Sequence, residues 1–102
     1  MHNMKLWRIL VPTVRNDGRP FRLRYHRVWD KKVRDISRGL TICTPVVGQW
    51  VDDEDVLYKE RMIPVEIACS EDDIFKIAEM TKVYYEQKAV FVYLMSHGAY
   101  VI

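Results

Sequence analysis

The side chains best suited to chemistry in this sequence are five cations that recur at helical spacing. They follow one another at intervals of three and four residues: Arg24, Arg27, Lys31, Arg34 and Arg38. Such spacing places side chains on one face of an α-helix. A row of cations on one helix face can neutralise successive phosphates of a nucleic acid and release their counterions. The same row could instead be a solvated face, or a face that docks an acidic protein.

The charges of the chain are distributed unevenly. Residues 1–38 hold eleven Lys and Arg against three Asp and Glu, a balance of +8, whereas residues 39–102 hold five against eleven, a balance of −6. Together they give the net charge of +2. This asymmetry predicts an anionic partner for the basic half, or pairing between chains. In the alternative, the two halves lie together in one fold and neutralise each other.

No set of residues has the spacing of a catalytic or metal site. His2, His26 and His97 lack the ligand spacing of a zinc site. The acidic run at residues 52–55 lacks the glycine and the distal glutamate of a calcium loop, so it is interpreted as a hairpin tip. The four glycines are scattered and form no phosphate-binding loop. The sequence therefore predicts no catalytic residues, no metal and no cofactor.

The two cysteines are interpreted as buried, reduced thiols. Cys43 and Cys69 are too few for a disulfide framework, and the start of the chain lacks the cleavage site of a signal peptide. Cys69 precedes a predicted helix, which would lower its pKa if it were exposed, but its alternating neighbours are apolar. These features predict a cytoplasmic protein. No membrane partner is expected, because the longest apolar stretch, 89–95, is far shorter than the roughly 18–20 residues that span a bilayer.

A length of 102 residues predicts a single domain, 1–102. Its apolar fraction of 49% is sufficient for a core. Periodicity and turn-forming residues divide the chain into a strand at 6–11, a helix at 21–38, a strand at 40–51 that is broken or bulged near Pro45 and Gly48, a strand at 57–69, a helix at 71–88 and a strand at 90–95. Ser70 is the expected N-cap of the second helix, and Gly39 lies where the first should end.

This order of elements predicts an α+β domain. Two right-handed β-α-β crossovers joined by a hairpin form the ferredoxin-like β-α-β-β-α-β plait, a four-stranded antiparallel sheet with two helices on one face. The plait leaves the second face of the sheet bare, and a half-apolar bare face is usually covered by a partner. We therefore expect a homodimer, formed through this face or through edge pairing of residues 100–102.

Three short segments resemble small, uncharacterised α/β-plait proteins of bacteria and bacteriophages. The segments are Gly39-Leu40-Thr41-Ile42, then Gly48-Gln49-Trp50, then Glu60 leading into Pro64-Val65-Glu66-Ile67. The resemblance covers about residues 39–95 and implies the fold. It carries no activity and no site residues.

Three functions remain open at the level of the sequence. The first is a small non-enzymatic interaction or regulatory module that acts as a homodimer. The second is a nucleic-acid or polyanion binder that uses the basic row of the first helix. The third is a small enzyme with a pocket at a dimer interface. The first is favoured because nothing in the chain pairs a nucleophile with a base.

Overall fold

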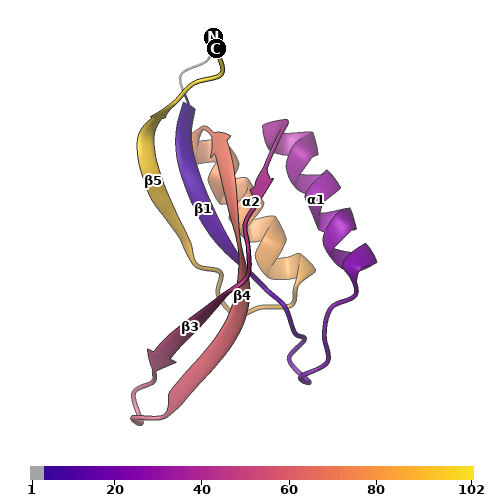
Figure 1. Ribbon diagram of the computed structural model, residues 1–102, viewed down its shortest axis with the longest axis vertical. Helices are drawn as coiled ribbons and strands as arrows, with labels where there is room; N and C mark the ends of the chain where they lie inside the picture. The colour runs from indigo at the N-terminus through magenta and orange to yellow at the C-terminus, as the bar shows by residue number, and fades with distance from the viewer. Residues whose placement is uncertain (1–3) are drawn as a thin grey trace.

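Seven elements follow one another in the computed structural model, which describes residues 4–102. They are β1 (Met4–Pro12), α1 (Leu23–Ser37), β2 (Thr41–Ile42), β3 (Val46–Val51), β4 (Leu57–Cys69), α2 (Glu71–Tyr84) and β5 (Val92–Ala99). The order of strands and helices is the one that the sequence predicted, except that the second strand is divided in two. The protein has an α+β, ferredoxin-like fold (Figure 1).

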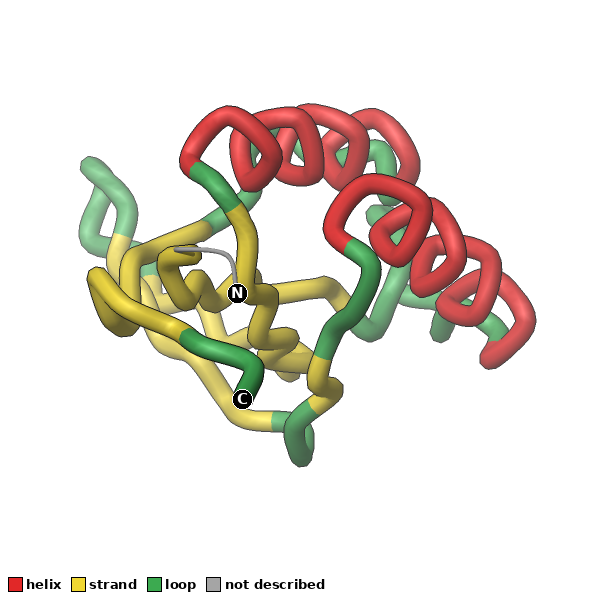
Figure 2. The backbone as a smooth tube through the Cα atoms, turned by 90° about the horizontal axis from the view of Figure 1, so that it is seen from above, coloured by secondary structure: helices red, strands yellow, loops and turns green. Residues whose placement is uncertain are grey.

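All strands belong to one antiparallel sheet. Its order is β2-β4-β1-β5. Strand β3 pairs with the first half of β4, and β2 pairs with the second half. The sheet has five strands where the sequence predicted four, because the chain leaves the sheet between Ile42 and Val46 and divides the second strand in two. Pro45 lies in this gap and has no N–H to donate. Figure 2 shows both helices on the same face of the sheet, as the sequence predicted.

The core lies between the helices and this face of the sheet. Alternate residues of β1 and β4 point into it, because successive side chains of a strand point to opposite faces. The buried apolar residues are Trp7, Ile9, Val11, Phe21, Trp29, Val33, Val65, Ile67, Cys69, Ile74, Ile77 and Tyr85. The core is thus built by β1, the second half of β4 and the inner faces of α1 and α2.

The hairpin of β3 and β4 extends beyond this core, as Figure 1 shows. We call residues 46–61 the arm and the rest of the described chain the body. Every residue of the arm is exposed except Gly48 and Asp52, which are half-buried. A strand rises about 3.3 Å per residue and a helix about 1.5 Å, so the 13 residues of β4 span about 43 Å and the 15 of α1 about 22 Å. The helices can therefore cover only part of β4.

The ends of the helices agree in part with the sequence. Ser70 caps α2 as predicted, and its Oγ accepts a hydrogen bond from the Asp73 N–H at 3.1 Å. At the end of α1 the left-handed residue is Arg38, with φ of 75°, and not the predicted Gly39. Helix α2 ends at Tyr84 and not near residue 88, because Glu86 also takes a positive φ, of 55°.

Strand β5 continues to Ala99, four residues beyond the predicted end. Its pairing with β1 changes register between Met4 and Trp7, opposite Ser96, so the strand continues through a bulge. Residues 100–102 follow the strand and are exposed.

Candidate anion-binding surface on the first helix

Helix α1 turns one face to the core and is fixed there by Trp29 and Val33. Both are buried, and the Trp29 indole N–H donates to Thr81 Oγ1 on α2 at 2.9 Å. The Thr81 hydroxyl in turn donates to the Ile77 carbonyl oxygen at 2.6 Å. This buried chain of hydrogen bonds sets the rotation of α1 about its axis and therefore decides which side chains face solvent.

The opposite face of α1 carries the five predicted cations, and all five are exposed: Arg24, Arg27, Lys31, Arg34 and Arg38. Lys31 pairs with Asp35 at 3.0 Å. Within residues 4–102, no carboxylate lies within ion-pair distance of the other four. Burial raises the pKa of Asp30 on the same helix, while the charges of Arg34, His26 and Arg27 lower it by smaller amounts. The structure therefore leaves most of the positive charge of this face unbalanced.

An aromatic cluster joins the start of α1 to the end of α2. The Tyr25 hydroxyl donates to the Tyr84 carbonyl oxygen, and the Tyr84 hydroxyl donates to the Tyr25 carbonyl oxygen at 2.8 Å. The two rings stack with centroids 4.2 Å apart, and the Phe21 ring also stacks with Tyr25, at 5.1 Å. These contacts anchor the first turn of α1 and make a firm base for the side chains above it.

His26 lies at the inner edge of this cluster. Its Nδ1 lies 2.7 Å from the Tyr85 hydroxyl, and Tyr85 is fully buried. Burial lowers the pKa of His26, while the nearby Asp30 raises it by a smaller amount. Burial also disfavours the charged form of the Tyr85 phenol and therefore raises its pKa, so both side chains are held neutral. They act as a hydrogen-bonded pair of the core and not as an exposed acid or base.

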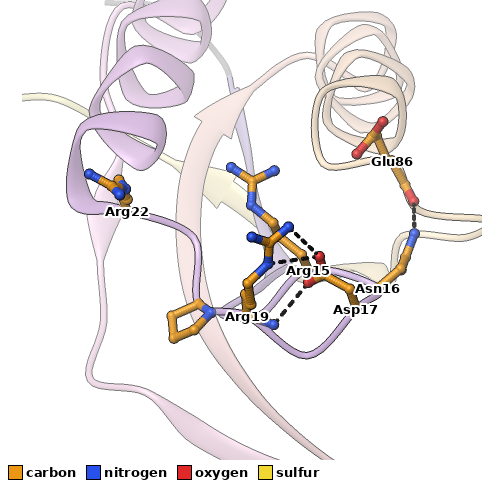
Figure 3. Close-up of a pocket in the computed structure, with 7 residues that line it drawn as sticks. Arg15, Asn16, Asp17, Arg19, Arg22 and Glu86 are labelled. Atoms are coloured by element: carbon orange, nitrogen blue, oxygen red, sulfur yellow. Dashed lines mark hydrogen bonds and ion pairs between the residues drawn. The ribbon is translucent and has the colours of Figure 1, made fainter.

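A pocket of about 680 Å³ opens where the β1–α1 loop passes the end of α2. It is lined by Arg15, Asn16, Asp17, Arg19, Pro20, Arg22 and Glu86. Figure 3 shows Arg22 at the start of α1 and Glu86 at the far side of the pocket. Asp17 accepts hydrogen bonds from the side chain and the backbone N–H of Arg19, and both lower the pKa of Asp17, the side-chain bond more than the backbone bond.

A smaller hollow of about 240 Å³ shares two residues with this pocket. Its lining is Arg15, Arg22, Arg24, Tyr25, Val28 and Tyr84. Three of these six are arginines and none is acidic. The Arg15 guanidinium lies over the Phe21 ring at 4.7 Å and over the Tyr25 ring at 5.1 Å, so the aromatic cluster supports it from below.

The sequence did not predict that these arginines meet at a hollow. Arg15 lies outside the predicted helix at 21–38 that carries Arg22, and Tyr84 is far away in the sequence. Only the packing of α2 against the start of α1 brings them together. The dense cluster of Arg15, Arg19 and Arg22 around the start of the predicted helix was the available signal.

The face of the sheet away from the helices carries one ion pair. Arg8 on β1 donates to the Glu66 carboxylate on β4 at 2.6 Å, and both side chains are about one-quarter exposed. The hydrogen bond to Glu66, and then that to Tyr93 on β5, raise the pKa of Arg8. The Arg8 Nε is buried without a hydrogen-bond partner among the described residues. No helix covers this face (Figure 2).

The cysteines differ in their surroundings. Neither forms a disulfide, but only Cys69 is buried, whereas Cys43 is half-buried in the link between β2 and β3, which corrects the prediction that both are buried. Burial and then the charge of Asp73 raise the pKa of the Cys69 thiol to about 11. The helix that follows Cys69 therefore does not activate it. Within residues 4–102, no three His, Cys, Asp or Glu side chains lie close enough to hold a metal ion.

Comparison with known proteins identifies relatives of the fold only. No family model matches the sequence, and no curated protein is significantly similar to it. A phage SAM lyase, solved with S-methyl-5'-thioadenosine, superposes with a TM-score of 0.69 at 15% identity, over 93% of this chain and 82% of that one. The divalent cation tolerance protein Cut A1 from Thermus thermophilus gives 0.67 at 10% identity, over 90% and 82%. CutA from Synechococcus elongatus gives 0.64 at 6% identity, over 94% and 78%.

These similarities agree with the expected resemblance to small α/β proteins that include phage proteins. At such identities they establish the fold and leave the activity open. No helix among residues 4–102 has the length and hydrophobicity needed to cross a bilayer.

Proposed function

We propose that the protein is a small self-associating interaction module, acting as a homodimer, and that the arm is its association surface. The observation that carries the proposal is the number of large apolar side chains on the arm. Seven of them are between 40% and 63% exposed: Val46, Val47, Trp50, Val51, Val56, Leu57 and Tyr58. Complete burial of one such side chain contributes about 1.5–3 kcal/mol. Exposed apolar surface gathered on one element indicates a protein interface.

The backbone of the arm supports the same proposal. Strand β3 pairs with β4 only, so within the described chain its outer edge has no strand beside it. A free, apolar edge strand favours pairing with another chain. Two copies related by a two-fold axis would satisfy both edges at once, since each copy presents the same surface.

The charges of the arm favour a second copy as the partner. The tip carries four acidic residues at 52–55, whereas Lys59 and Arg61 lie nearer the body. Antiparallel pairing of two β3 edges would bring the acidic tip of each arm to the base of the other, where the basic residues lie one strand away on β4. Opposite charges that meet in this way steer association and fix its register.

The test is the solution mass of three proteins by multi-angle light scattering. The wild type should have about twice the monomer mass of 12.2 kDa. Val47→Glu places a charge on the apolar surface of the arm, so association should be lost. The new carboxylate lies opposite Arg61 in the β3–β4 register, so the monomer should keep its fold. Val83→Glu makes the same change on α2, at a site that is 76% exposed against 63% for Val47, and should leave the mass unchanged. A monomeric wild type would refute the proposal.

A second candidate function is binding of a nucleic acid or another polyanion along α1. It is supported by the exposure of all five cations and by the absence of ion pairs at four of them within residues 4–102. The double reversal Arg27→Glu and Arg34→Glu should abolish retardation of DNA or RNA in a low-salt gel-shift series. The matched reversal Lys76→Glu and Lys88→Glu, on exposed residues outside α1, should not. Binding should fall steeply with salt.

The third possibility, an enzyme with a pocket between two copies, is supported only by the fold shared with the phage SAM lyase. A shared fold does not carry an activity from one protein to another. Calorimetric titration with S-methyl-5'-thioadenosine tests it directly, and measurable binding would favour it over a purely structural module.

A further inference from the structure

We propose that the hollow lined by Arg15, Arg22 and Arg24 binds the phosphate group of a small molecule. The hollow has its own place in the fold, between the β1–α1 loop, the first turn of α1 and the end of α2. It differs from the row of cations along α1 because it is concave and because two of its three arginines lie outside that row.

Charge is the first argument. The three arginines line one small space, and within residues 4–102 no carboxylate lies within ion-pair distance of any of them. Asp17, the acid of the same loop, forms its ion pair with Arg19 at 2.7 Å and interacts with Arg15 only at longer range, where the Arg15 charge helps to lower the pKa of Asp17. Like charges that converge repel one another, and a bound anion would remove this cost.

The second argument is the way in which Arg15 is held. Its guanidinium carbon lies 4.7 Å from the centre of the Phe21 ring and 5.1 Å from that of Tyr25, so both rings hold the group by cation–π contact. The Arg15 side chain makes no hydrogen bond within residues 4–102, so its N–H donors are available for the two parallel hydrogen bonds that a guanidinium makes to phosphate. A side chain fixed in this way loses little entropy when it binds a ligand.

The loop that carries Arg15 is fixed as well. The Arg15 N–H donates to the Arg19 carbonyl oxygen at 2.7 Å, and the Gly18 N–H donates back to the Arg15 carbonyl oxygen at 2.9 Å. Gly18 has φ of +87°, a conformation that suits glycine, which has no Cβ. The Asn16 amide donates to the Glu86 carbonyl oxygen at 2.9 Å and ties the loop to the end of α2.

Size indicates the class of ligand. A volume of about 240 Å³ is below the roughly 300–1,000 Å³ typical of sites for drug-sized molecules, so the hollow suits one compact group. The larger pocket of about 680 Å³ shares Arg15 and Arg22 with it and offers room for the rest of the molecule. A phosphate monoester, with a dianionic head and a small polar remainder, fits this pair of spaces.

The experiment is calorimetric titration of the full chain with inorganic phosphate, in sodium chloride adjusted to constant ionic strength. Arg15→Gln and Arg22→Gln should each weaken phosphate binding by about tenfold, since each removes a charge-assisted donor. Arg34→Gln and Arg38→Gln remove equal charges near the other end of α1 and should change it by less than about twofold. Arg22 is exposed, so its variant should fold even if loss of Arg15 disturbs the loop.

A second titration distinguishes the sources of the phosphate. Glycerol 3-phosphate should bind more tightly than inorganic phosphate, and glycerol should not bind. The proposal is overturned if neither phosphate binds to the wild type. It is also overturned if only an oligonucleotide binds and Arg34→Gln weakens that binding as much as Arg15→Gln, because the cations would then act as one diffuse surface. Neither outcome depends on whether the protein self-associates.

Discussion

The two halves of β4 have the same backbone conformation and opposite surroundings. From Met62 to Cys69 the strand pairs with β1 along its length and with β2 at Val65 and Glu66. In this half Val65, Ile67 and Cys69 are buried. From Leu57 to Arg61 it pairs with β3 alone, and every residue is exposed. The difference arises from the lengths of helices and strands, since α1 and α2 cannot reach along the whole of β4. The second half of β4 therefore contributes to the core, and its first half is exposed to solvent.

The same contrast separates the body, which stabilises the fold, from the arm, which we propose mediates association. The body has a buried apolar layer and a hydrogen-bonded link between its helices, so it contains the elements of a stable domain. The arm has seven exposed apolar side chains and no helix over it. Its proposed stabilisation comes from a second copy of the chain.

The largest expected effect is that of truncation in the buried half of β4. Ile67→Ala should lower the free energy of unfolding by about 2–5 kcal/mol, because it removes a fully buried side chain and leaves a cavity. Leu57→Ala, on the same strand but 53% exposed, should cost less than about 1 kcal/mol in the monomer. Urea denaturation at low protein concentration measures both. Equal losses would contradict the division into body and arm.

The cysteines offer a second comparison of the same kind. Cys69 is 4% exposed and its pKa is about 11, so almost none of it is thiolate at neutral pH. A thiol reagent should modify half-buried Cys43 in the native protein and should reach Cys69 only after denaturation. Peptide mass analysis follows each site, and the Cys43→Ser variant should show no native labelling. Modification of Cys69 at the rate of Cys43 would show that the end of β4 opens readily.

A smaller effect is expected from acid, and it should act on the body. Burial lowers the pKa of His26 below its usual value, so between the two pKa values the unfolded chain binds a proton that the folded chain does not. The free energy of unfolding should therefore fall as the pH drops below about 6.5, until the folded-state pKa is passed. Urea midpoints between pH 7.5 and 5 measure this slope. His26→Gln should flatten it, and an unchanged slope would exclude His26 as its cause.

The sequence predicted the body more fully than the arm, for a physical reason. Alternation of apolar residues at Ile63, Val65 and Ile67 determines which face of a strand a core can bury, and the structure agrees. The same alternation does not show whether a helix is long enough to cover the first half of β4. Lys59 and Arg61 were the visible signal, since they place charges on the face that would otherwise be apolar. The division of the second strand had a comparable signal in Pro45.

The residues of the candidate site also differ in how far the sequence predicted their arrangement. Helical spacing within one segment predicted that Arg24, Arg27, Lys31, Arg34 and Arg38 share a face, and all five are exposed. The hollow at Arg15 and Arg22 depends on Tyr84, which the chain brings back only at the end of α2. Contacts between distant segments depend on packing, and local periodicity does not contain them. The functional use of either set stays a prediction.

Hydrogen–deuterium exchange at two protein concentrations tests the central claim most directly, because it reads the body and the arm in one sample. Peptides from β1 and residues 62–69 should be protected equally at both concentrations. Peptides from residues 46–61 should exchange quickly in the dilute sample and become protected in the concentrated one, as two arms pair. In Val47→Glu this gain in protection should disappear. Fast exchange of the arm at both concentrations would contradict its role as an association surface.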